Sequence, residues 1–467
     1  MIPLVSRQLK WVPDLLGNVV MAVLAGMAAS TIGRSEIYSI GAWGRLGVNL
    51  RLDGLTTLML IVINVVGLAV TIYSVAYMTR YTSKLRYYSL FLCLVAALNG
   101  VALSGDIFST YVFMEIAALC SYALVAFGCE HDELEASFKY AVMGSLTSSF
   151  ILIGIALTYG MVGTLDMAEI AVRLKGGMNK PLLFALSLFL CGFGLKAALV
   201  PFHAWLPAAH PSAPAPVSAM LSAVVVKTLG VYTLCRFVFN IFGVTPELLL
   251  VLRWMGLFSM VLGVLMAIVQ WDMKRLFAYS TIGQIGYIAV GLGLGTPLGI
   301  VGALFHLMNH AVAKSLLFLS AGAVEYATDT RDLRELGGLR RKMPVTANAS
   351  LLGSMAISGI PPLNGFWSKL IIILACVQAG HPVLALAAVL ASIMTLAACL
   401  KVQKYAFFDE GKSALLSRVH EVPLMMRVAM LILCLLCVGM ALMTLTGLKT
   451  PFLIDSAASV LLGRMRI

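Results

Sequence analysis

Helix-length apolar segments recur along almost the whole chain, and they constrain the fold more than any other feature of the sequence. A transmembrane α-helix needs about 20 mostly apolar residues, and thirteen such segments are separated by short charged loops. They cover about 12–32, 54–78, 87–104, 105–128, 136–160, 181–207, 214–240, 246–270, 273–293, 297–323, 344–380, 383–408 and 424–447. Only 12% of the 467 residues are charged, against about 25% in a soluble domain. We therefore expect an all-α polytopic membrane protein with 13 to 14 transmembrane helices.

The net charge of +12 indicates topology rather than nucleic-acid binding, because the excess lysines and arginines occupy short loops and form no basic tail. When the loops are assigned to alternating faces, the face of the N-terminus receives seventeen basic residues and the other face eleven. The positive-inside rule then places the N-terminus in the cytoplasm. We expect a multi-pass protein of the inner (cytoplasmic) cell membrane, and Arg7 and Lys10 precede a retained first helix rather than a signal peptide.

No cofactor or metal site is expected in this chain. The nine cysteines are scattered, mostly inside apolar segments, where they act as small buried side chains. Cys434 and Cys437 have the CxxC spacing but lack a second pair or a histidine to complete a site. The acidic residues between 130 and 135 are expected to form a solvated surface loop.

Two of the apolar segments are predicted to be broken helices. The first contains Lys196 and breaks near Pro201, and the second breaks at 358–362 ahead of Lys369. A break at membrane depth is tolerated only where protein or a water-filled cavity satisfies the freed backbone groups.

The two breaks lie five spans apart, which gives them opposite orientations. We therefore predict two inverted five-helix repeats, an arrangement typical of transporters with a site at the bilayer midplane. The predicted segments are N-terminal helices in 1–86, a first repeat in 87–240, a second repeat in 246–408, and a C-terminal helix and tail in 424–467.

Seven ionisable residues fall well inside predicted spans, and they are the candidates for a proton path. They are Glu115, Lys196, Lys227, His306, His310, Lys314 and Lys369. A charge at the centre of a membrane helix costs about 2.5 to 3.5 kcal/mol on insertion scales. A single lysine can snorkel to the interface, but seven such residues, two of them beside helix breaks, favour a function. Four further residues are secondary candidates: Lys139, His203, His210 and Lys401.

The spacing of these residues indicates how protons could move. His306, His310 and Lys314 recur every four residues, which puts them on one stripe of a helix. The HxxxH pair could instead bind zinc, but no third ligand is nearby and the glutamate of HExxH is absent. The proton affinity of a buried lysine depends on whether a carboxylate is close, so we expect Glu115 and Lys196 to act as a switchable pair.

Four motifs carry a resemblance to a known family: LKAALVPFHAWLPAAHPSAPAPVSAMLSAVVVK, DMKRLFAYSTIGQIGY, HLMNHAVAKSLLFLSAG and SGIPPLNGFWSK. The chain resembles the antiporter-like subunits shared by respiratory complex I, Mrp cation/proton antiporters and membrane-bound energy-converting [NiFe] hydrogenases. The resemblance implies fourteen helices and a proton path along a central polar axis. It makes Glu115 and Lys196 the coupling ion pair, Lys227 the next relay, the stripe of two histidines and Lys314 the bridge, and Lys369 the terminal group.

The sequence departs from that family in three respects. It has thirteen helices, because it starts where the family has its second helix. No long lateral helix follows the last span. The segments 330–339 and 401–408 look closest to hydrogenase-type members.

The expected function is that of a proton-translocating subunit in a redox-driven membrane complex, with no catalytic site of its own. Its partners would be other membrane subunits and a peripheral redox module with Fe–S clusters and, in the hydrogenase type, a NiFe centre. The alternative is a subunit of an Mrp-type Na⁺/H⁺ antiporter, which would also move sodium. A solute permease or an inert membrane scaffold is a third reading, which the row of buried lysines and histidines disfavours.

Overall fold

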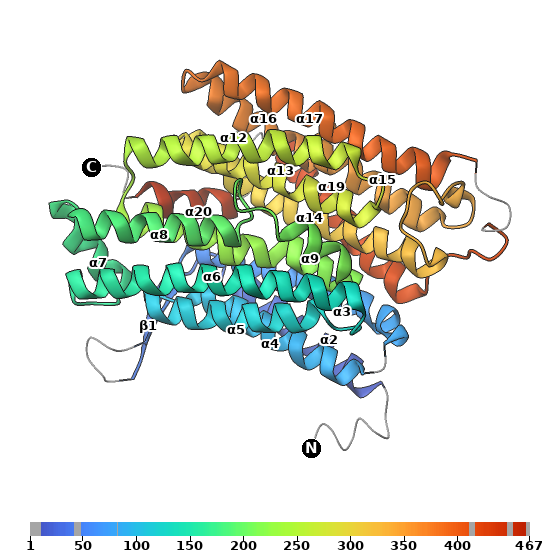
Figure 1. Ribbon diagram of the computed structural model, residues 1–467, viewed down its shortest axis with the longest axis horizontal. Helices are drawn as coiled ribbons and strands as arrows, with labels where there is room; N and C mark the ends of the chain where they lie inside the picture. Colours follow the sequence, from blue (N-terminus) through green and yellow to red (C-terminus); the bar gives the residue numbers. More distant parts are fainter. Residues whose placement is uncertain (1–10, 42–47, 82, 411–415, 446–451, 464–467) are drawn as a thin grey trace.

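The computed structural model describes residues 11–41, 48–81, 83–410, 416–445 and 452–463. Its helices run roughly side by side along the longest axis of the molecule (Figure 1). Within these residues, eleven helices or continuous helical stretches are long and apolar enough to cross a membrane. They are α2 (Val12–Ser30), α3–η2 (Gly54–Arg80), α4 (Lys84–Leu103), α5 (Ile107–Val125), α6 (His131–Val162), α10–η4–α11–η5 (Ala215–Phe242), α12 (Pro246–Val269), α13 (Met273–Gly293), α14 (Pro297–Thr328), α17–η7 (Pro382–Phe408) and α19 (Leu424–Leu445). The prediction of an all-α polytopic membrane protein is confirmed.

Two further crossings are broken helices, as the sequence predicts. The first consists of α8 (Lys180–Lys196) and α9 (Leu206–Ser212), and the second of α15 (Pro344–Ser358) and α16 (Asn364–Gln378). With the eleven candidate spans they match the positions of the thirteen predicted segments. At the first break, the Trp205 Nε1–H donates to the Leu195 carbonyl at 2.9 Å, and the Ser259 hydroxyl accepts from the Val200 N–H at 2.8 Å. Protein groups therefore satisfy the backbone that the break frees.

The two predicted repeats contain the same backbone tie at matching places. In the first, the start of α5 pairs with the turn before α7 (Met167–Arg173) through Asp106 and Asp166. In the second, the start of α13 pairs with the loop after α14 through Asp272 and Asp332, each 166 residues further on. The first tie lies beside α7, at the left end in Figure 1, whereas Arg331 of the second contacts the end of α9 at the other end. These ties support the predicted repeats, whose inverted orientation and boundaries stay a prediction.

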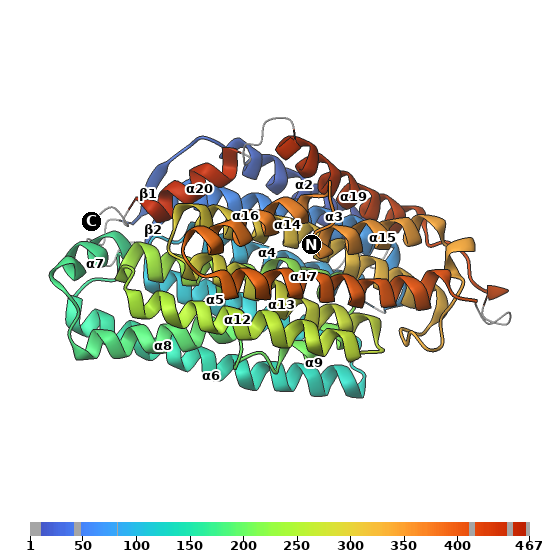
Figure 2. The same ribbon diagram turned by 90° about the horizontal axis from the view of Figure 1, so that it is seen from above.

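Helix α14 lies near the centre of the bundle in both views (Figures 1 and 2). The apolar window of α13 is wholly buried and that of α14 is 94% buried, whereas those of α2, α17 and α19 are only 22%, 33% and 33% buried. Glycines bring α12 and α13 into direct backbone contact, because a Cβ on Gly263 would meet the backbone of Gly283, and one on Gly286 would meet that of Met260. Small residues allow this close approach between membrane helices.

Three local features add to the sequence predictions or differ from them. The polar loop after the first helix contains a hairpin in which β1 (Glu36–Ile40) pairs antiparallel with β2 (Val48–Leu52). For the C-terminal tail the sequence leaves a short interfacial helix and a frayed end both open; the structure has the helix α20 (Phe452–Leu462) there, and the Asn240 amide donates to the Val460 carbonyl at 2.9 Å. Helix α14 continues to Thr328, so that Glu325 belongs to this helix and not to a loop. Several basic residues counted for the topology lie outside the described residues: Arg7, Lys10, Arg45, Lys412, Lys449, Arg464 and Arg466.

Candidate functional site

A stripe of ionisable side chains follows the buried face of α14. His306, His310 and Lys314 are at most 1% exposed, and the two imidazole centroids are 6.1 Å apart. The Nδ1 of His306 lies 3.0 Å from the Ser368 hydroxyl of α16, and its Nε2 lies 3.1 Å from the Gln284 side-chain oxygen of α13. The stripe therefore joins three helices through polar contacts at the centre of the bundle.

From Lys314, the last member of the stripe, the row continues to Lys227 in the first half of the molecule. The Lys314 ammonium donates to the Phe277 carbonyl at 2.8 Å. Lys227 lies in η4 (Leu221–Tyr232), a π-helix, and its ammonium donates to the Ser222 carbonyl within that helix. The Ser222 hydroxyl is 2.8 Å from the Thr281 hydroxyl of α13. Wider π-turns are frequent at functional sites, and this one holds a fully buried lysine.

Two buried histidines have ring nitrogens without a hydrogen-bond partner among the described residues. They are His210 of α9 and His310 of α14, and neither is exposed. The charges of Lys227 and Lys314 act on both rings. Because an unpaired buried polar group costs about 1 to 3 kcal/mol, these rings favour a hydrogen-bond partner such as water.

The second half of the row ends at Lys369 of α16, which is 2% exposed. Its ammonium is 3.3 Å from the Ser392 hydroxyl and lies 4.8 Å above the centre of the Tyr287 ring. It also lines a cavity of about 270 Å³ beside the break at Gly359. A titratable group here lies between the central stripe and an opening in the bundle.

The first half of the row contains the predicted pair Glu115 and Lys196. Glu115 is half-buried on α5 and accepts a hydrogen bond from the Ser148 hydroxyl of α6. Lys196 is the last residue of α8, immediately before the break, and is 5% exposed. The Glu115 charge acts on Lys196, but the ion pairs within 4.0 Å that the described residues form do not include these two. The structure therefore holds the pair apart.

Comparison with known protein families shows to which family the chain belongs. Residues 104–395 match the family described as NADH:quinone oxidoreductase/Mrp antiporter, TM, and residues 42–88 match the N-terminus of chain 5 of NADH-ubiquinone oxidoreductase (complex I). The chain belongs to this antiporter-like family.

Similar curated members of the antiporter-like family come from three kinds of complex. The chain is 36% identical to an NADH-quinone oxidoreductase subunit of Desulforudis audaxviator over 82% of its own length and 79% of that protein. It is 34% identical to a Na⁺/H⁺ antiporter subunit of Alkalihalophilus pseudofirmus, with coverages of 80% and 77%. It is 34% identical to a hydrogenase-4 component of Escherichia coli, with coverages of 85% and 62%.

Solved structures of the antiporter-like family have the same fold. A chain of the Mrp complex from Dietzia sp. DQ12-45-1b superposes with a TM-score of 0.89 at 26% identity, covering 97% of this chain and 93% of the other. A chain of the membrane-bound sulfane sulfur reductase, an archaeal respiratory membrane complex, gives 0.88 at 31% identity, with coverages of 98% and 96%.

Of the four secondary candidates, His210 belongs to the central row, and the other three lie outside it. Lys139 is exposed and pairs with Glu135 on the surface of α6, and His203 is only partly buried in the α8–α9 break. The Lys401 ammonium donates to the carbonyls of Ile268 and Gln270 at 2.9 and 2.8 Å. The structure thus gives Lys401 a role in capping the C-terminal end of α12.

An ion pair at the end of α14 was missed by the sequence reasoning. Lys274 of α13, 1% exposed, lies 2.6 Å from the Glu325 carboxylate. Arg331 pairs with Asp272 at 2.5 Å and with Glu325 at 3.5 Å. Burial lowers the pKa of Arg331, but these two carboxylates outweigh that effect and hold it above its ordinary value. The sequence held one signal for this ion pair. Glu325 follows Lys314 by eleven residues, and this spacing places the two side chains on the same face of an α-helix.

The acidic segment at 130–135 was predicted to be a solvated loop, but residues 131–135 belong to α6 and one of them is buried. Glu133 belongs to the first turn of α6 and is 8% exposed.

Among the described residues, no group of three or more His, Cys, Asp and Glu side chains is arranged to hold a metal ion.

Proposed function

We propose that this chain is the proton-translocating subunit of a redox-driven membrane complex of the energy-converting hydrogenase or complex I type. The observation that carries the proposal is the row of buried lysines and histidines that runs from the α8–α9 break through η4 and α14 to the α15–α16 break. Ionisable groups kept inside a membrane bundle are usually functional because they are costly to bury.

The contacts of the row suggest a role for each member. Glu115 and Lys196 form the coupling pair, which this structure holds apart, and the proton affinity of the lysine changes with its distance from the carboxylate. Lys227 is the next relay, the stripe of His306, His310 and Lys314 is the bridge, and Lys369 is the terminal group. Histidine suits this work because its proton exchanges near neutral pH.

The proposed partners follow from the named relatives, which are subunits of multi-subunit membrane complexes. Other membrane subunits would pack against the exposed apolar faces of the rim helices. A peripheral module with Fe–S clusters, and a NiFe centre in the hydrogenase type, would supply the redox energy. The complex would lie in the inner (cytoplasmic) cell membrane with the N-terminus of this chain in the cytoplasm.

A second candidate is an Mrp-type Na⁺/H⁺ antiporter subunit. The similarity to the Na⁺/H⁺ antiporter of Alkalihalophilus pseudofirmus and to a chain of the Mrp complex favours it. Mass spectrometry of the co-purifying subunits would separate the two candidates, because a redox complex contains Fe–S proteins and an antiporter does not.

The proposal is tested by proton uptake in proteoliposomes that contain the purified complex. Lys196→Ala and Glu115→Ala should each reduce coupled uptake by about tenfold or more, since no other titratable group can replace a missing member of a path through hydrocarbon. Lys175→Ala, on an exposed turn, serves as the matched control. Normal uptake in both variants, with normal assembly, would contradict the proposal.

A further inference from the structure

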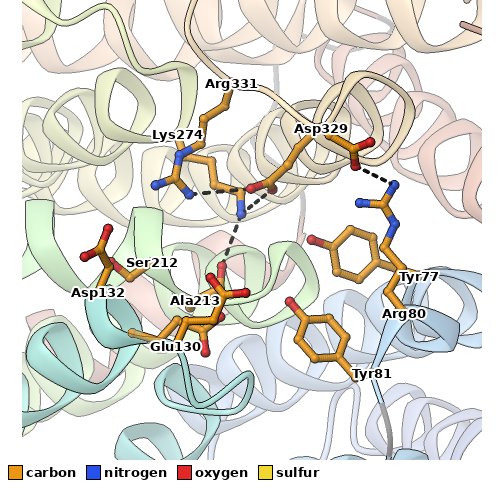
Figure 3. Close-up of a pocket in the computed structure, with 12 residues that line it drawn as sticks. Tyr77, Arg80, Tyr81, Glu130, Asp132, Ser212, Ala213, Lys274, Asp329 and Arg331 are labelled. Carbon is orange, nitrogen blue, oxygen red and sulfur yellow. Dashed lines mark hydrogen bonds and ion pairs between the residues drawn. The ribbon is translucent and has the colours of Figure 1, made fainter. Parts of the chain in front are cut away.

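A polar cavity of about 240 Å³ lies at the end of the bundle where α13 begins and α14 ends (Figure 3). Five segments line it: the end of α3–η2, the start of α6, the connection between α9 and α10, the start of α13 and the end of α14. None of the lysines and histidines of the central row lines it. Its wall consists mainly of charged residues and tyrosines, so it is a water-accessible recess rather than a packing defect.

The inner wall of this cavity holds a buried lysine paired with one carboxylate, and a second buried carboxylate lines the same cavity. Lys274 pairs with Glu325 at 2.6 Å and donates to the Ala213 carbonyl at 3.2 Å. Figure 3 shows Lys274 between Arg331 and Ala213. Glu133, more than nine-tenths buried, also lines the cavity, and its Oε2 has no hydrogen-bond partner among the described residues. An unpaired carboxylate oxygen in a buried wall favours a ligand that brings a proton or a positive charge.

The same wall leads toward the central row. Ala213, which accepts from Lys274, is three residues after His210. Both ring nitrogens of His210 are unpartnered among the described residues, and the charges of Lys227 and Lys314 act on this ring. His210 is therefore close in sequence to the cavity wall and near enough to Lys227 and Lys314 to be influenced by their charges.

Arg331 closes one side of the cavity. It pairs with Glu325 and Asp272 and donates to the Pro211 carbonyl at 2.7 Å. A second polar cavity of about 360 Å³ shares Arg331, Ser212 and Asp132 with the first. Arg331 thus separates two recesses and keeps Glu325 beside Lys274.

We propose that the cavity around Glu133, Lys274 and Glu325 is the vestibule through which protons reach the central row. The inference rests on the proposed function. A hydronium ion gives its proton to the Glu133 carboxylate and leaves as water. The carboxyl group then gives the proton to a water molecule farther inside the cavity, which restores the carboxylate, while the ion pair between Lys274 and Glu325 stays intact. One proton moves inward, and no bond between heavy atoms changes.

The first test compares two neighbouring acids in proteoliposomes of the whole complex. Glu133→Gln removes the acceptor with little change in shape and should slow proton uptake about tenfold. Glu135→Gln changes a nearby acid that does not line this cavity and whose side chain is 50% exposed, and uptake should change less than about twofold. Equal rates in the two variants, with equal recovery of the complex, would overturn the vestibule.

The second test blocks the cavity chemically and does not depend on removing a charge. Both variants carry Cys129→Ser, which removes an exposed cysteine that the reagent could label. In this background, Ser212→Cys is labelled with 2-sulfonatoethyl methanethiosulfonate. Lys404→Cys, on an exposed surface, is labelled in the same way as the matched control. Labelling of Ser212→Cys should reduce uptake about tenfold and labelling of the control less than twofold. Complete labelling, seen as a mass shift, with unchanged uptake would overturn the proposal.

The two levels of inference fail differently. If Lys314→Ala abolishes uptake while labelled Ser212→Cys retains it, the vestibule is wrong and the proposed function stands. If Lys314→Ala itself transports protons at the normal rate, the proposed function is wrong, and the vestibule is wrong with it.

Discussion

The two halves of the molecule present opposite chemistry at matching positions. Helices α5 and α13 each begin after a capping aspartate, and at the same distance from it α5 has Glu115 and α13 has Thr281. The helices that follow, α6 and α14, are both 32 residues long, and Ser148 and Lys314 occupy the same position in them. In the first half a carboxylate accepts from a hydroxyl. In the second half a hydroxyl and a lysine occupy the same two places.

The surroundings of the two sites differ as much as their chemistry. The apolar window of α6 is 39% buried and that of α14 is 94% buried. The acidic site therefore lies toward the rim of the bundle, and the basic site lies in its centre. The comparison teaches that one helix arrangement can hold either charge, and that position in the bundle decides whether the site is open to neighbours or enclosed.

The strongest test of this comparison replaces the matching residues of α6 and α14. Lys314→Ala should reduce proton uptake by about tenfold or more, because it removes a titratable group from the enclosed centre. Ser148→Ala removes only one hydrogen bond, worth about 1.5 to 3 kcal/mol when the acceptor is charged, and leaves Glu115 in place. Proteoliposome uptake measures both, and equal losses would show that the two halves do not differ in this way.

A second test asks whether the end of the row in the second half needs a lysine or any titratable group. Lys369→Ala should reduce uptake about tenfold, and Lys369→Glu about threefold, since a group that can carry a proton survives. Ser392→Ala, which removes the hydroxyl next to this ammonium, is the control for local packing. Equal losses in the alanine and glutamate variants would count against a relay role for Lys369.

A third test concerns the ion pair that fixes the π-helical span of the first half. Arg236 donates to both oxygens of Asp53 at 2.6 and 2.8 Å, and both side chains are buried. Asp53→Asn should lower the free energy of unfolding by about 3 kcal/mol, because it leaves a buried charge unpaired. Chemical denaturation in detergent measures this loss. Arg173→Gln, which breaks a pair at the surface, should change it by less than about 1 kcal/mol.

The pH dependence of the Asp53 pair has a defined sign. Burial raises the pKa of Asp53, but Arg236, the Thr56 N–H and Arg51 together hold it below its ordinary value. The stabilisation is therefore fully present above the unfolded pKa of about 3.9 and is lost as the pH falls through the lower folded pKa. The difference in stability between the wild type and Asp53→Asn should stay constant from pH 7 to pH 5 and close below about pH 4. A gap that widens on acidification would contradict this assignment.

The smallest effect on stability is expected from replacing Lys401, in the second half of the molecule. Lys401 caps α12 and lies 3.8 Å from the centre of the Trp271 ring. Lys401→Met should lower the stability by about 1 kcal/mol, as expected for a lost helix cap and cation–π contact, and should leave proton uptake unchanged. A large loss of uptake would return Lys401 to the proton path.

The spans, the two breaks and the burial of the row could be predicted from the sequence, because they depend on local apolar runs and on the cost of placing charge in hydrocarbon. The spacing of the stripe on α14 was readable for the same reason. These features need no knowledge of which helices are neighbours.

What the sequence did not show depends on contacts between distant segments. Lys274 was expected in the first turn of its helix and Glu325 in a loop, and the pair could not be foreseen because only the packed bundle brings α13 and the end of α14 together. Glu133 was placed on a solvated surface because its buried environment comes from other parts of the chain. Likewise, the hydrogen bond between Ser148 and Glu115 joins two helices and leaves no local signal.

The glycine contact between α12 and α13 has a mechanical consequence. The apolar window of α12 is 39% buried, whereas that of α13 is wholly buried, and α13 carries Lys274 and Gln284 against the polar interior. At the glycine positions the two backbones are in direct contact, so no flexible side chain there can absorb a displacement. We therefore expect a displacement of α12 by lipid or by a neighbouring protein to shift α13 and the polar side chains that it carries.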